Sequence, residues 1–392
     1  MRRRDFLIET SRAVLGGSFL ASTARAQGTP IPAAASKIDH AAMIAELERL
    51  IPPLLRDSKV PGASIAVIDD ARLVWRRGFG VKDSASQEPV DHDTVFEAAS
   101  VSKTVFAYAV LKLCEQGILD LDTPLTKYAP TRFLAGDARL DLITARHVLS
   151  HTTGFQDWRS GGAPLKIHFT PGTQFSYSGE GYYYLQSVVT HLIGRTDPAH
   201  RAKYEAGLEV VATDIDACLN RRLLRPFGMA ASGYLWNESF ARHVTRPHDL
   251  AGNPLAKARP SATDAARYAS AGGLHTTATD YARFLLEILD PKPSDEFRLN
   301  QRSLAEMVRP QVKLDEQQKI DGANAWALGW AVQQRATGNV IVHSGGQSGF
   351  RSLAMASVDR RSGFIILTNG DNGGNVVYDQ ALGAVLNRLL PS

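Results

Sequence analysis

Hydrophobic and polar residues alternate in two stretches near the start of the chain and in several near its end. Segments 63–69 and 72–80 read ASIAVID and RLVWRRGFG with a short turn between them, which predicts an antiparallel hairpin. Strand patterns return at 326–333, 338–343, 350–358 and 363–369. Helical periodicity predicts helices at 40–57 and 376–390, and from about 100 to 310 the pattern is mainly helical with long loops.

Strands at both ends of the chain with helices between them predict an α+β fold. One antiparallel sheet would be completed by the N- and C-terminal segments, flanked by helices, and would carry an inserted, mainly helical lobe at roughly 100–320. A single domain over 40–392 follows, and the cleft between lobe and sheet is where a pocket is expected. The stretch 196–220 looks like an insertion on the surface of that lobe.

The first 26 residues differ in composition from the rest. Three arginines, Arg2 to Arg4, precede an apolar stretch at 13–21, and Ala24-Arg25-Ala26 offers a small-residue cleavage site. This order predicts a cleavable export signal at 1–26 of the twin-arginine type, followed by a Pro/Ala-containing linker at 27–39. The apolar stretch is too short for a stable membrane span, so we expect a periplasmic or otherwise exported protein.

Charge and cysteine content exclude some classes of protein. The formal net charge of +4 falls to about +1 without the arginine-rich first 26 residues, so it gives no support for nucleic-acid binding. With 44% hydrophobic and 21% charged residues, the 392-residue chain can bury a large core. Two cysteines, Cys114 and Cys218, are too few for a disulfide framework, and the sequence leaves open whether they pair.

The run TVFEAASVSK at 94–103 places Ser100 and Lys103 three positions apart at the start of a predicted helix. Its buried stripe consists of Phe106, Ala109, Val110, Leu113 and Cys114, and Gly117 ends it. At this spacing both side chains lie on one helix face, where an amine can take the proton of a hydroxyl nucleophile. The Ser100 N–H would be one of the unpaired donors of the first turn and could hold an oxyanion.

Two later segments carry further candidate chemistry. Tyr177 follows the turn signal Pro171-Gly172 and precedes an apolar-periodic stretch from Tyr183. Near the C-terminus, NVIVHSGGQSGFRSLAMASVD reads as a strand, a glycine-rich turn and a second strand. Its glycines, Gly345, Gly346 and Gly349, would let the main chain approach a ligand closely.

These three segments, in this order, resemble the signatures of the serine β-lactamase and penicillin-binding-protein superfamily, specifically its class C-like branch, which includes serine esterases and D-amino-acid peptidases. The segments VLSHTTGF, LLRPFGM and AGGLHTTATDYARFL are similar to family text as well, and the resemblance covers about residue 40 onward. It implies a β-lactamase/transpeptidase-like fold and an acyl-enzyme at Ser100. It implies a small-molecule or short-peptide substrate and neither a metal nor an organic cofactor.

The resemblance also assigns roles to individual residues. Ser100 would be the nucleophile, Lys103 its proton acceptor and Tyr177 the proton shuttle to the leaving group. The N–H groups of Ser100 and Gly346 would form the oxyanion hole, and one of Lys103 and Tyr177 must have a depressed pKa. His343, Ser344 and Gly345 would bind substrate at the Lys-Thr-Gly-like strand.

Two departures from the family pattern bear on the substrate. Gly179 stands where the Tyr-x-Asn signature has the asparagine that holds the substrate's acyl-side amide, and His343 stands in place of the strand lysine. Histidine is largely neutral near pH 7, so the grip on a substrate carboxylate is weaker, unless Arg351 compensates. Both changes favour an esterase or peptidase over a dedicated β-lactamase.

Four other classes of protein can be compared with these residues. His147 and His151 have the i, i+4 spacing of a helical metal site, but the residues between them include no glutamate and a structural role is favoured. A class C β-lactamase proper and a non-catalytic module that binds cell-wall peptides or penicillin remain alternatives. An α/β-hydrolase is excluded because no Gly-x-Ser-x-Gly elbow follows a strand.

Overall fold

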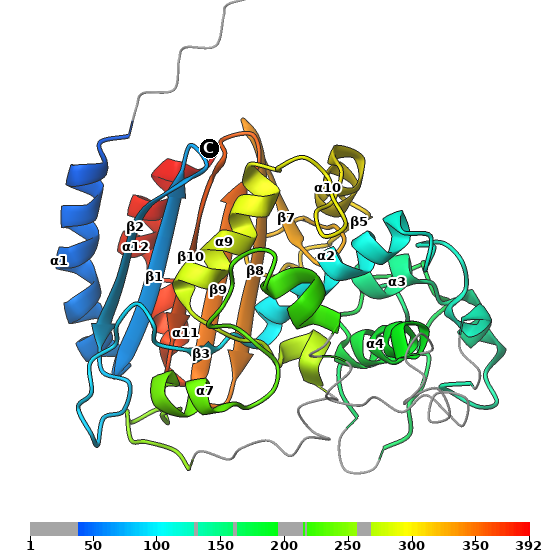
Figure 1. Cartoon of the computed structure of the whole chain (residues 1–392), viewed down its shortest axis with the longest axis horizontal. Coiled ribbons are helices and arrows are strands. Elements are labelled where there is room, and N and C mark those ends of the chain that lie inside the picture. The colour runs from blue at the N-terminus through cyan, green and yellow to red at the C-terminus, as the bar shows by residue number, and fades with distance from the viewer. Residues whose placement is uncertain (1–37, 129–131, 160–162, 195–214, 216–217, 257–267) are drawn as a thin grey trace, which may run out of the picture. The chain divides into compact units, whose positions relative to one another are not determined.

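A large antiparallel sheet organises the protein (Figure 1). The computed structural model describes residues 38–128, 132–159, 163–194, 215, 218–256 and 268–392. The expected export signal at 1–26 and most of the linker at 27–39 lie outside these ranges, as does most of the expected insertion at 196–220.

The order of strands in the sheet is β2-β1-β10-β9-β8-β7-β6-β5, and every neighbouring pair is antiparallel. The strands are β1 (Gly62–Asp69), β2 (Arg72–Gly80), β5 (Val312–Lys313), β6 (Ala325–Trp326), β7 (Ala331–Arg335), β8 (Gly338–Gln347), β9 (Phe350–Ser357) and β10 (Ser362–Thr368). The C-terminal strand β10 lies between β9 and the N-terminal strand β1. The predicted α+β fold, with one sheet built from both ends of the chain, is therefore confirmed.

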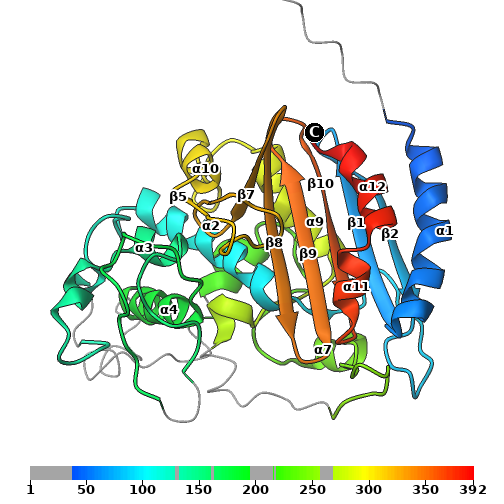
Figure 2. The same cartoon turned by 180° about the vertical axis from the view of Figure 1, so that it is seen from behind.

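Helices cover both faces of this sheet (Figures 1 and 2). Helices α1 (His40–Ser58), α11 (Gly373–Val377) and α12 (Gln380–Leu386) pack on one face, where their apolar residues join those of β1, β9 and β10 in one core cluster. Helix α9 (Ala278–Leu289) covers the other face, on the side of the lobe that carries α2 (Ser102–Glu115), α3 (Ala145–Leu149) and α4 (Gly179–Gly194). The remaining elements include β3 (Phe96–Glu97), β4 (His275–Thr276), α7 (Glu238–His243) and α10 (Gln301–Val308).

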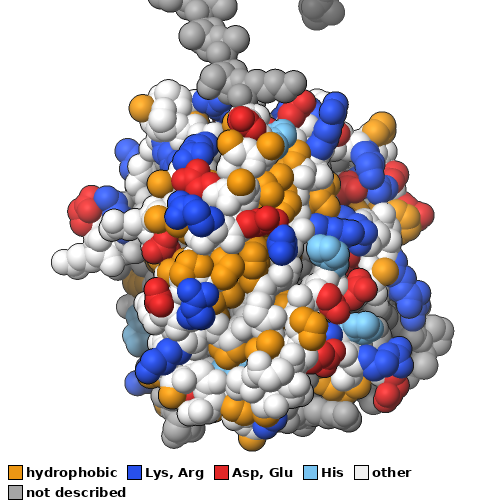
Figure 3. Space-filling view, turned by 90° about the vertical axis from the view of Figure 1, so that its left-hand side faces the viewer, with side chains coloured by type: hydrophobic (Ala, Val, Ile, Leu, Met, Phe, Trp, Pro, Cys, Tyr) orange, Lys and Arg blue, Asp and Glu red, His pale blue; other side chains and the backbone are white. Residues whose placement is uncertain are grey.

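One face of the molecule shows how its charged side chains are distributed. Viewed onto the side where α1 lies, acidic and basic side chains are interspersed around apolar patches, with no single-sign field (Figure 3). Among the described residues no helix combines the length and apolarity needed to cross a membrane. Cys114 and Cys218 do not form a disulfide with each other, which answers the question the sequence left open.

The ends of several elements differ from the predictions. The predicted strand at 326–333 is two strands, because the chain reverses between β6 and β7 through Gly329 at φ +83°. The expected glycine-rich turn lies later, since β8 continues through Gly345 and Gly346 to Gln347. The single closing helix predicted at 376–390 is instead α11, α12 and a short 3₁₀ turn, with a break at Tyr378 and Asp379, whose carboxylate caps α12.

Candidate active site

Ser100 lies on a tight turn before helix α2. The helix begins at Ser102, two residues later than the serine, and Ala99–Val101 form a 3₁₀ turn. Ala99 has φ +50°, a left-handed conformation that non-glycine residues rarely adopt. The preceding residue is held from two sides: Ala98 N–H donates to Leu274 O at 2.8 Å, and Ser352 Oγ donates to Ala98 O at 2.8 Å. The strained turn is therefore fixed by its neighbours.

Lys103 is buried beside this serine. Its side chain is 1% exposed, its Nζ lies 3.3 Å from Ser100 Oγ, and it donates to Ala271 O at 2.7 Å. Burial lowers the Lys103 pKa to about 7, against the opposing effect of the Asp157 carboxylate. A neutral amine is therefore populated near neutral pH, which is the state that can accept a proton.

Tyr177 completes the cluster from the segment just before α4. Its hydroxyl hydrogen-bonds Ser100, and Lys103 Nζ lies 4.8 Å from the centroid of its ring. Burial raises the Tyr177 pKa well above its usual value, more than the hydrogen bond to Ser100 lowers it. One of these two groups was expected to have a depressed pKa. That group is Lys103, and Tyr177 stays a protonated phenol.

His151 positions Tyr177, and the sequence analysis missed this role. The two rings stack at 4.2 Å between centroids, and His151 Nδ1 accepts the Ser178 N–H at 3.0 Å. The expected i, i+4 relation to His147 does not exist, because α3 ends at Leu149 and His151 has φ +55°. The family-like text VLSHTTGF contained the signal, but nothing in it showed which ring His151 would meet.

Strand β8 brings its backbone against the nucleophile. A Cβ on Gly345 would lie 2.6 Å from Ala98 O and 3.0 Å from Ser100 N, so only glycine fits there. Strand β7 pairs with β8 only as far as Val342, and the next N–H on that edge, from Ser344, donates to Asp321 Oδ2 at 2.9 Å. Because N–H groups alternate between the two edges of a strand, the Gly346 N–H lies on this same open edge.

His343 is buried, 3% exposed, near the rings of Tyr177 and Trp326. Burial lowers its pKa to about 3, and the nearby Lys103 charge acts in the same direction, so the imidazole is neutral at physiological pH. Its Nδ1 lies 2.6 Å from Ser344 O, which makes Nδ1 the protonated nitrogen and leaves Nε2 as a buried acceptor without a partner among the described residues.

Arg351 does not face the nucleophile. Gly345 points toward Ser100, whereas a Cβ on Gly346 would lie 3.5 Å from Arg351 Cδ, so Arg351 occupies the opposite face of the sheet. The guanidinium donates to Gln347 O at 2.6 Å and Phe350 O at 2.7 Å, and pairs with Asp371 at 3.4 Å. It is thus neither a solvated strand residue nor an uncommitted cation beside Ser100.

The place of the missing asparagine side chain is filled by an aromatic ring. A Cβ on Gly179 would lie 2.2 Å from Cε2 and Cζ2 of Trp158, so the indole lies directly against this glycine. The Gly179 N–H donates to Asp157 Oδ1 at 2.8 Å, and the Trp158 ring meets Tyr268 edge-on at 5.1 Å. An apolar surface thereby replaces the amide of the family signature.

Comparisons with known proteins agree with this fold. A sequence model of the Beta-lactamase family matches residues 47–387. Among solved structures, a class C beta-lactamase superposes with a TM-score of 0.70 at 18% identity, covering 90% of this chain and 97% of that one. The structure of SurE gives a TM-score of 0.69 at 24% identity, covering 89% and 76%. The fold is therefore β-lactamase/transpeptidase-like.

Two curated relatives add sequence similarity. Esterase EstB of Burkholderia gladioli is 35% identical over 130 residues, which is 33% of this chain and 33% of EstB. Protein flp of Staphylococcus aureus strain N315 is 21% identical over 343 residues, covering 83% of this chain. The matches thus span about a third of EstB and 62% of flp. With the family match over most of its length, the chain belongs to the Beta-lactamase family.

Proposed function

We propose that the protein is an exported serine hydrolase that cleaves esters or amides through an acyl-enzyme at Ser100. The observation that carries the proposal is the contact between Ser100 Oγ and a buried amine at 3.3 Å whose pKa is about 7. An amine that is neutral near pH 7 is a competent general base for a hydroxyl nucleophile.

The residues divide the steps of the reaction between them. As Ser100 Oγ attacks the carbonyl carbon, its proton passes to Lys103 Nζ. The oxyanion that forms accepts hydrogen bonds from the N–H groups of Ser100 and Gly346. Tyr177, a phenol at all relevant pH values, donates its proton to the leaving oxygen or nitrogen, and its phenolate then takes up the proton that Lys103 received from Ser100. A water molecule then attacks the acyl carbon and loses a proton to Lys103. The bond between the acyl carbon and Ser100 Oγ breaks, and Ser100 takes the proton back as the acid is released.

Several features favour an ester over a β-lactam. Trp158 excludes a side chain at position 179, so no amide stands there to hold the acyl-side amide of a penicillin. His343 is neutral where a lysine would supply a permanent charge. The 35% identity to an esterase over 130 residues points the same way. Short-chain esters are therefore the substrates we expect to turn over fastest.

The first experiment compares three substrates with the wild type and with Ser100→Ala. We expect hydrolysis of nitrophenyl acetate to exceed that of nitrocefin and of a D-alanyl peptide, and Ser100→Ala to lose about 10⁴-fold or more in kcat. Unchanged circular dichroism would show that the variant is folded. Activity retained by a folded Ser100→Ala refutes the assignment, and a dominant nitrocefin rate makes the protein a β-lactamase proper. Substrate binding without turnover by the wild type would indicate the non-catalytic module.

A further inference from the structure

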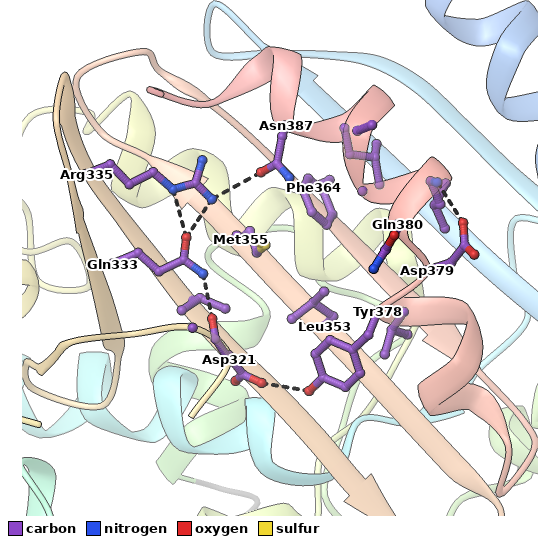
Figure 4. A pocket seen from close by; sticks show the side chains of 17 residues that line it. Asp321, Gln333, Arg335, Leu353, Met355, Phe364, Tyr378, Asp379, Gln380 and Asn387 are labelled. Carbon is purple, nitrogen blue, oxygen red and sulfur yellow. Dashed lines mark hydrogen bonds between the residues drawn. The ribbon is translucent and has the colours of Figure 1, made fainter. Parts of the chain in front are cut away.

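The open edge of β8 next to the nucleophile carries a fixed negative charge. The pairing of β7 with β8 ends at Val342. Beyond it, the Ser344 N–H on the open edge donates to the Asp321 carboxylate at 2.9 Å. The other oxygen of this carboxylate accepts the Tyr378 hydroxyl at 2.6 Å (Figure 4). Asp321 belongs to the loop between β5 and β6 and has φ +55°, so loop geometry directs it at the strand.

The Asp321 carboxylate accepts the hydrogen bond of the Ser344 N–H, which is the next N–H along this edge from the oxyanion donor of Gly346. Ser344 and Gly346 are two residues apart on one edge, which at the rise of an antiparallel strand separates their N–H groups by about 7 Å. A substrate whose oxyanion is held by Gly346 meets the Ser344 N–H when its other end lies back along β8. The Ser344 N–H already donates to Asp321, whose carboxylate is an anion.

The cations near this edge do not neutralise Asp321. Arg351 is paired with Asp371 and two carbonyl oxygens, and the His343 imidazole is uncharged at pH 7. Lys103 is needed in its neutral form for the proposed chemistry. The field of Asp321 reaches the catalytic groups, because it contributes to the raised pKa of Tyr177.

We propose that Asp321 is a specificity residue that disfavours substrates with a negative charge on the half lying along β8, so that the site selects neutral esters. This inference rests on the proposed function. Because the family signature places the acyl half beside Gly179, the half that reaches Ser344 is the leaving group. Asp321 touches no reacting atom and acts through charge and through the occupied Ser344 N–H.

The test uses two aryl acetates whose leaving groups carry either a carboxylate or its neutral methyl ester, 4-acetoxybenzoate and methyl 4-acetoxybenzoate. The wild type should hydrolyse the methyl ester with the higher kcat/KM, after each is normalised to its hydroxide-catalysed rate. Asp321→Asn keeps an acceptor for the Ser344 N–H and suits the left-handed backbone. It should raise kcat/KM for the anionic ester about 10-fold and change that for the methyl ester less than about 2-fold.

The matched control is Asp379→Asn. Asp321 and Asp379 both line one cavity of about 710 Å³, but the Asp379 carboxylate caps the N-terminus of α12 (Figure 4). This variant should leave both rates unchanged. A second measurement needs no variant: raising the salt concentration should increase the wild-type rate with the anionic ester relative to the methyl ester.

Two results would overturn the inference: equal changes for both esters in Asp321→Asn, or a wild-type preference that salt does not affect. The proposed function has a separate readout, because it fails if the wild type does not hydrolyse the methyl ester or if that hydrolysis survives in Ser100→Ala.

Discussion

At the scale of residues, burial of Lys103 and Tyr177 moves the pKa values of these two groups in opposite directions. Desolvation disfavours the charged form of each group, which is a cation for lysine and an anion for tyrosine. It therefore lowers the pKa of Lys103 to about 7, and it raises the pKa of Tyr177 so that the phenol stays protonated. One environment thus yields an acceptor and a donor on either side of the Ser100 hydroxyl.

The Lys103 pKa predicts the acid limb of the pH profile. Its pKa is lowered, so the ammonium persists only below about pH 7, and kcat/KM for a neutral ester should fall as pH decreases through about 7. Asp157→Asn removes the carboxylate that raises this pKa and should move the midpoint to lower pH. Initial rates between pH 5 and 9 measure both; a flat profile, or a midpoint that rises in the variant, contradicts the role of Lys103.

Single residues show which contacts the sequence could predict and which it could not. Ser100, Lys103 and Tyr177 were found because each lies in a short motif, and the structure brings them into contact. His151, Trp158 and Asp321 were not assigned, because each acts through a neighbour that is distant in sequence or reaches the site from an irregular loop. Periodicity carries no information on such contacts.

At the scale of elements, strand β8 is the most constrained part of the site. The two adjacent glycines differ: Gly345 faces Ala98 and Ser100 at distances that admit no Cβ, whereas a Cβ on Gly346 would lie 3.5 Å from Arg351 Cδ, an ordinary contact. The sequence analysis placed both in a turn. Their position within a strand comes from pairing with β9, a long-range property that local patterns do not fix.

Gly345→Ala should therefore push β8 away from the nucleophile turn. We expect a loss of about 1–3 kcal/mol in the free energy of unfolding from overpacking. A drop of about 100-fold or more in kcat/KM should accompany it, as the oxyanion donors separate. Urea unfolding and ester hydrolysis measure the two effects. Gly346→Ala is the control for stability and should unfold close to the wild type; equal destabilisation of both variants would contradict the difference between the two faces.

At the scale of the whole molecule, the sequence predicted the architecture better than the ends of its elements. Strands at both ends of the chain required one sheet, and the order β2-β1-β10-β9-β8 is that sheet. The later errors, at the β6–β7 reversal and in the C-terminal helices, lie where short loops rather than apolar periodicity decide where an element ends.

The export proposal also belongs to this scale. If residues 1–26 are a cleaved twin-arginine signal, the exported protein should begin at Gln27, and Arg3→Lys combined with Arg4→Lys should retain the precursor in the cytoplasm. Mass spectrometry of the exported protein and cell fractionation measure these outcomes. Ester hydrolysis in lysates controls for folding of the variant. An exported form that still begins at Met1 would contradict cleavage, and undiminished export of the double variant would contradict the twin-arginine route.

The position of β10 between β1 and β9 has a consequence for biosynthesis. Gly62 N–H donates to Asn369 Oδ1 across a separation of 307 residues, so the first strands made by the ribosome must wait for nearly the last. At about 5–20 residues per second, that delay is on the order of 15–60 s. Throughout it the nascent hairpin presents an unsatisfied strand border that chaperones would need to shield from other chains.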